Sequence, residues 1–116
     1  MALSEFEAAR VTRAVGTFIE ARRPPAHIRP KLDLGFRLSG QSVVIFEIRP
    51  VWRGPLGEKR EHAVAKATYV RAGGLWRVYW QRQDLKWHRY EPAPEVASIE
   101  DFLGLVQEDR HACFFG

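Results

Sequence analysis

The chain has 116 residues, of which 46% are hydrophobic and 28% are charged, and its net charge at pH 7 is +4. This length suits one domain with a single core, and no apolar run approaches the ~20 residues that span a bilayer. The first residues lack the basic and apolar segments of a secretory signal, and the single cysteine, Cys113, excludes an internal disulfide. We therefore expect one domain over residues 1–116, located in the cytoplasm and not in a membrane.

The first predicted element is a helix over residues 5–22. Ser4 and Glu7 have the spacing of a capping box, and apolar residues then recur at helical intervals. Pro24 and Pro25 cannot continue a helix, so residues 24–30 are interpreted as a connector.

Four or five strands are predicted next. Alternating apolar and polar residues indicate a strand over residues 32–38, and a β-branched run indicates a second over residues 42–52. A loop is expected over residues 53–57, followed by strands over residues 63–72 and 75–83 joined by a two-residue turn at Gly73 and Gly74. A second tight turn, at Gln83 and Asp84, would begin a fifth strand.

The turns predict which side chains share a face of the sheet. A two-residue turn at Gly73 and Gly74 places Ala67 opposite Trp80, and the next turn places Trp87 opposite Trp80. We therefore predict that both tryptophans are buried in the core. The other face then carries Lys66, Thr68, Arg77, Tyr79 and Gln81, with His88 opposite Tyr79 and Lys86 nearby.

A second helix is predicted after Ser98, which is followed by Asp101 and by apolar residues at helical spacing, and it should end near residue 108 or 109. The apolar segment 113–116 is expected to dock against the fold. The predicted fold class is α+β, with an N-terminal helix, an antiparallel meander sheet of four to five strands and a C-terminal helix.

Four segments of the chain resemble a family of short bacterial proteins, the domain of unknown function 3024. They are residues 23–30 (RPPAHIRP), 45–50 (IFEIRP), 84–88 (DLKWH) and 113–116 (CFFG). The resemblance extends over nearly the whole chain and implies a bacterial origin and a stand-alone domain. It implies no catalytic residues, because the family carries no assigned activity.

The aromatic and basic outer face is the leading candidate site. Bases can stack on exposed rings while cations contact phosphates, so Lys66, Arg77, Tyr79, Lys86 and His88 are the predicted binding residues. The expected function is a non-enzymatic binding module, with single-stranded nucleic acid as the first partner and a protein as the second. Two alternatives stay open: the face is only a solvated basic surface, or the second helix covers it.

A metal-dependent nuclease is the alternative from another class. A three-residue turn at residues 39–41 would place Asp33 opposite Glu47, with Arg49 on the same face, and paired carboxylates beside a cation are typical of Mg²⁺ nucleases. Arg49 stays protonated, however, and cannot act as a base. The four histidines and Cys113 lack the spacing of zinc ligands, so no metal site and no cofactor are predicted.

Overall fold

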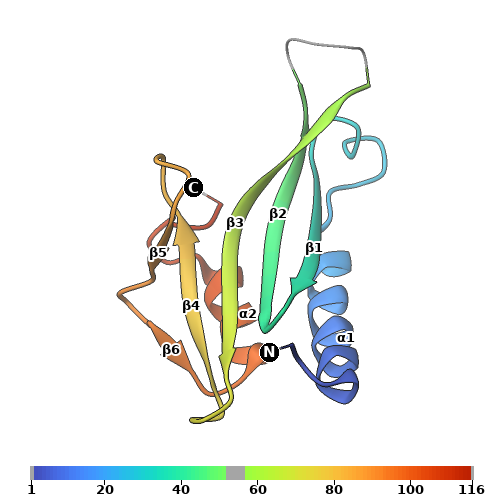
Figure 1. Cartoon of the computed structure of the whole chain (residues 1–116). Coiled ribbons are helices and arrows are strands. Elements are labelled where there is room, and N and C mark those ends of the chain that lie inside the picture. The colour runs from blue at the N-terminus through green and yellow to red at the C-terminus, as the bar shows by residue number, and fades with distance from the viewer. Residues whose placement is uncertain (1, 52–56, 116) are drawn as a thin grey trace.

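The computed structural model describes residues 2–51 and 57–115 (Figure 1). Its helices and strands, in chain order, are α1 (Glu5–Arg22), β1 (Asp33–Ser39), β2 (Ser42–Pro50), β3 (Lys59–Val70), β4 (Leu75–Gln81), β5 (Trp87–Arg89), β6 (Glu95–Val96) and α2 (Ile99–Glu108). Trp52, the predicted end of the second strand, and residues 53–56 of the predicted loop lie outside the described residues.

The strands form an antiparallel meander, which confirms the predicted fold class. Five strands follow one another in the order β1-β2-β3-β4-β5, and β6 pairs with β4 beside β5. α1 precedes the sheet and α2 follows it. Neither helix in the described part of the chain is long and apolar enough to cross a membrane.

α1 begins with the capping box that the sequence predicts. The Ser4 hydroxyl accepts a hydrogen bond from the Glu7 amide at 3.1 Å, and the Glu7 carboxylate accepts one from the Ser4 amide at 2.8 Å. Arg71, from the turn after β3, also donates to the Glu7 carboxylate. These contacts lower the pKa of Glu7 to about 2, and the hydrogen bond from Arg71 is the largest cause.

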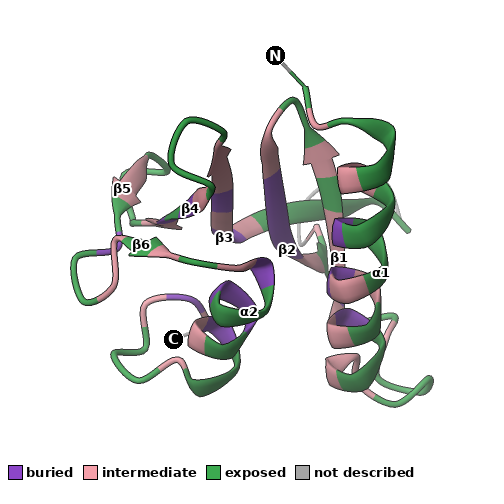
Figure 2. Cartoon of the chain, turned by 90° about the horizontal axis from the view of Figure 1, so that it is seen from below, coloured by how far each residue is buried: buried purple, intermediate pink, exposed green. Residues whose placement is uncertain are grey.

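Both helices contribute to one core on one face of the sheet, which we call the inner face. Val11, Val15 and Ile19 of α1 pack in the same cluster as apolar residues of α2 and of β1 to β4. In Figure 2, the sheet is seen along its strands, with α2 under it and α1 beside β1. α2 therefore does not cover the opposite face, which we call the outer face; Figure 1 looks onto it, with α2 behind the sheet.

The C-terminal segment docks against this core, as predicted. Phe114 is buried, and its ring lies 4.9 Å from that of Tyr90. The Asp109 carboxylate accepts hydrogen bonds from the backbone amides of Phe114 and Phe115, at 3.0 and 2.9 Å. Burial raises the pKa of the neighbouring Cys113 thiol, which keeps it in its less reactive protonated form.

The three tight turns that were predicted, β1–β2, β3–β4 and β4–β5, all differ in length from the prediction. The first contains only Gly40 and Gln41, because Ser39 pairs with Ser42 and Gly40 adopts a φ of 60°. The turn between β3 and β4 occupies residues 71–74, and that between β4 and β5 occupies residues 82–86. Leu85 supplies the positive φ, 61°, of this last turn.

These turn lengths change the register between neighbouring strands. A register displaced by an even number of residues keeps each side chain on its predicted face, whereas an odd displacement moves it to the other face. The β3–β4 register is displaced by two residues, so Ala67 lies opposite Val78 rather than Trp80 but stays on the inner face. The β4–β5 register is displaced by one. Trp80 is therefore half-buried opposite His88, and Trp87 lies half-buried on the outer face. The prediction that Trp87 is a buried core residue is wrong, whereas Trp80 packs against the core, as predicted, but is only half-buried.

Among the described tryptophans, the buried one is Trp76, which is 6% exposed and whose ring lies 5.1 Å from that of Tyr69 on the inner face.

A β-bulge interrupts the pairing of β2 with β3. Ile45 pairs with Ala65, and the next residue, Phe46, pairs with Ala63, so Val64 is the extra residue. Val64 and Ala65 are both buried in the inner core.

Candidate nucleic-acid interface

One row of side chains crosses the outer face from β1 to β5. The backbone pairings place these five residues side by side on successive strands: Arg37, Val44, Lys66, Tyr79 and Arg89. A second row, beside it, runs from Ser42 through Thr68 to Arg77 and Glu95. Side chains on one face of neighbouring strands lie about 5 Å apart, so the first row is a continuous strip with three cations.

Lys66 lies at the centre of the strip between two aromatic rings. Its ammonium nitrogen is 4.8 Å from the centre of the Tyr79 ring and 4.9 Å from that of Trp87. Both distances are within the range of cation–π attraction. Burial lowers the pKa of Lys66, because desolvation disfavours the charged form. The three side chains form what we call the Lys66 clamp.

At the β1 end of the strip, apolar side chains lie beneath a charged one. Val44 and Phe46 are buried although they point to the outer face. The Arg37 guanidinium lies 5.0 Å from the centre of the Phe46 ring and forms an ion pair with Glu61 of β3. Arg37 therefore shields apolar surface with its stem while its charge is compensated.

The predicted binding residues occupy three different places. Lys66, Arg77 and Tyr79 lie on the outer face, as predicted. Lys86 is exposed in the β4–β5 turn. His88 was expected opposite Tyr79, but the one-residue displacement places it opposite Trp80, where its Nε2 lies 2.8 Å from an oxygen of Asp84.

Sequence reasoning missed three outer-face residues, Arg37, Trp87 and Arg89. Trp87 was predicted to lie in the core, and neither arginine was among the predicted binding residues. A signal for two of them exists in the alternation of Trp87, His88 and Arg89, which puts the first and third on one face of a strand. Reading it correctly requires the length of the preceding turn.

The residues of the nuclease alternative do not converge. The two-residue first turn places Asp33 opposite Ile48, and Glu47 opposite Leu34, so the two carboxylates belong to opposite faces of the hairpin. The predicted pairing of Asp33 with Glu47 is therefore wrong. Arg49 contacts only Glu47 of this pair, at 3.2 Å.

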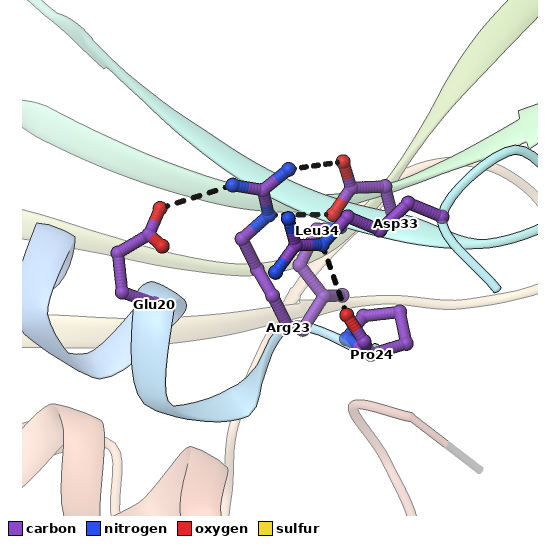
Figure 3. Close-up of polar contacts among 6 residues, drawn as sticks. Glu20, Arg23, Pro24, Asp33 and Leu34 are labelled. Carbon is purple, nitrogen blue, oxygen red and sulfur yellow. Dashed lines mark hydrogen bonds and ion pairs between the residues drawn. The ribbon is translucent and has the colours of Figure 1, made fainter. Parts of the chain in front are cut away.

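Asp33 is instead held by Arg23 (Figure 3). Nε and Nη2 of Arg23 each donate a hydrogen bond to the Asp33 carboxylate at 2.8 Å, and Nη1 donates to Glu20 at 3.2 Å. The Arg23 contact is the main cause that lowers the pKa of Asp33. This bidentate pair links the end of α1 to the start of β1, and it occupies the carboxylate oxygens that a metal ion would need.

Among the described residues, no group of three or more His, Cys, Asp or Glu side chains lies close enough to hold a metal ion.

The comparison with protein families agrees with the resemblance of the four sequence segments. The model of a domain of unknown function (DUF3024) matches residues 3–116. The chain belongs to this family. No match was found among curated proteins or among solved structures.

Proposed function

We propose that this DUF3024 protein is a non-enzymatic module that binds single-stranded nucleic acid on its outer face, in the bacterial cytoplasm. The observation that carries the proposal is the Lys66 clamp, in which a cation and two half-buried rings share a sheet face that α2 leaves open. Bases stack on such rings whatever their sequence, and cations beside them attract phosphates.

The strip sets the direction and length of the bound strand. Four strand spacings of about 4.8 Å separate Arg37 from Arg89, which gives a strip of roughly 19 Å. An unstacked strand advances by roughly 7 Å per nucleotide, about twice the ~3.4 Å rise of a stacked one. The strip therefore accommodates about three nucleotides that run across the β-strands.

The test is fluorescence anisotropy with labelled oligothymidylates of increasing length at low salt. We expect weak binding that stops improving steeply once the strand exceeds the strip. Trp87→Ala and Tyr79→Ala should each weaken binding by about 1–3 kcal/mol, the usual contribution of one stacked base. Phe6→Ala is the matched control, because this ring is 81% exposed on α1, away from the strip.

Two results would contradict the proposal. One is the absence of binding at low salt, which would favour the protein partner on the same face. The other is an equal loss of affinity in the Trp87→Ala and Phe6→Ala variants, which would place the contact elsewhere.

A further inference from the structure

A small cavity lies at the edge of the sheet, where β5 and β6 leave a gap along β4. The Val78 amide donates to the Pro94 carbonyl at 2.9 Å, and the Tyr90 amide donates to the Val78 carbonyl at 3.0 Å. These bonds satisfy the β4 backbone while residues 91–93 leave the sheet. The cavity measures about 110 Å³ and is lined by Arg77, Val78, Tyr79, Arg89, Pro94 and Glu95.

The polar lining of this cavity favours an anion. Arg77 and Arg89 supply guanidinium donors, and Tyr79 supplies a phenol. The single carboxylate, Glu95, is opposite Arg77 on β6, at 3.6 Å from its Nε. That separation exceeds a hydrogen bond, so Arg77 keeps its donors for another acceptor. Arg89 forms no ion pair with any described residue.

We infer that this cavity binds a phosphate monoester. If the proposed function holds, on which this second step rests, the monoester is the terminal phosphate of the bound strand. Two arguments favour a terminal group over an internal phosphodiester. A monoester carries up to two negative charges, which two guanidiniums match. The cavity also lies where the strip ends, since Arg89 belongs to the last strand of the row.

Glu95 weakens the site in this arrangement, because its negative charge repels the phosphate and attracts Arg77. Removing that charge should strengthen phosphate binding. A gain of affinity is informative, since damage to the fold does not produce one.

The experiment compares three oligonucleotides of one sequence, with a 5′-phosphate, a 3′-phosphate or hydroxyls at both ends. We expect one phosphorylated strand to bind about tenfold more tightly than the hydroxyl strand, as one charge-assisted contact would give. Arg89→Gln should remove this preference, and Glu95→Gln should increase it. Arg110→Gln and Glu5→Gln are the matched controls, because both residues are exposed and lie outside the cavity.

A second measurement separates this inference from the proposed function. Thymidine 5′- and 3′-monophosphate are titrated into the protein while backbone amide NMR signals are followed, and saturable shifts at Arg77, Arg89 and Glu95 would support the cavity even if no oligonucleotide binds. Equal affinity for all three strands overturns the terminal-phosphate inference and leaves the proposed function intact. Monophosphates that shift none of these signals overturn the cavity as a phosphate site.

Discussion

The salt dependence of oligonucleotide binding follows from the number of cations on the outer face. The two rows of side chains described above contain four: Arg37, Lys66, Arg77 and Arg89. Arg37 and Arg77 each lie beside a carboxylate, whereas Lys66 and Arg89 form no ion pair within the described residues. Two to four phosphate contacts are therefore expected.

Each contact with a single strand contributes about −0.7 to the slope of log K against log salt concentration. The predicted slope thus lies between about −1.4 for two contacts and about −2.8 for four. Raising the salt from ~50 to ~200 mM should then lower the affinity between about sevenfold and about fiftyfold.

The assay is an anisotropy titration of a hydroxyl-ended oligonucleotide at several KCl concentrations. Arg89→Gln should make the slope shallower by about 0.7, because one phosphate contact is lost. Arg110→Gln removes the same charge from an exposed residue near the C-terminus and should leave the slope unchanged. Equal slopes for the two variants, or a wild-type slope near zero, would refute the assignment of the strip as the phosphate path.

Three further predictions concern stability and pH. Trp76→Ala should lower the free energy of unfolding, measured by urea denaturation, by about 3–5 kcal/mol, because it removes a buried ring. Trp87→Ala should lower it by less, because that ring is only half-buried, and equal losses would contradict the burial of Trp76. Asp33→Asn should cost about 1.5–3 kcal/mol at neutral pH because it breaks the pair with Arg23. Because folding lowers the pKa of Asp33, the stabilisation by the Arg23–Asp33 pair is fully present above the pKa of Asp33 in the unfolded chain and is lost as the pH falls through its pKa in the folded protein. The urea denaturation curves of wild type and Asp33→Asn should therefore converge in strong acid. Oligonucleotide affinity should fall with rising pH sooner in wild type than in Lys66→Arg, because the lowered pKa of Lys66 makes it lose its charge earlier than an ordinary lysine; identical anisotropy profiles would contradict this.

The elements could be predicted from the sequence because their signals are local. The Ser4 capping box, the alternation in residues 32–38 and the Ser98 cap each depend on a few adjacent residues, and all three appear in the structure. Cross-strand neighbours depend instead on turn length, which glycine positions alone do not determine. Gly73 and Gly74 are the second half of a four-residue turn, for example.

Residues of the candidate site were placed on the correct face only where the predicted strand register was displaced by an even number of residues. Lys66 and Tyr79 stayed on one face under a two-residue displacement, whereas Trp87 and His88 exchanged faces under a one-residue displacement. The partner of Asp33 was missed for a different reason. Arg23 is the C-terminal cap of α1, and no periodic pattern links it to a strand.

The bulge at Val64 makes the two ends of the strip differ in charge. With regular pairing continued from Ile45 and Ala65, Glu61 would lie opposite Arg49 and belong to the inner face; the extra residue turns it outward, where it meets Arg37. One end of the strip is thereby neutralised, while Arg89 at the other end keeps its charge. A polyanion would therefore be attracted more strongly to the β5 end of the strip than to the β1 end, as a consequence of one inserted residue on the third strand.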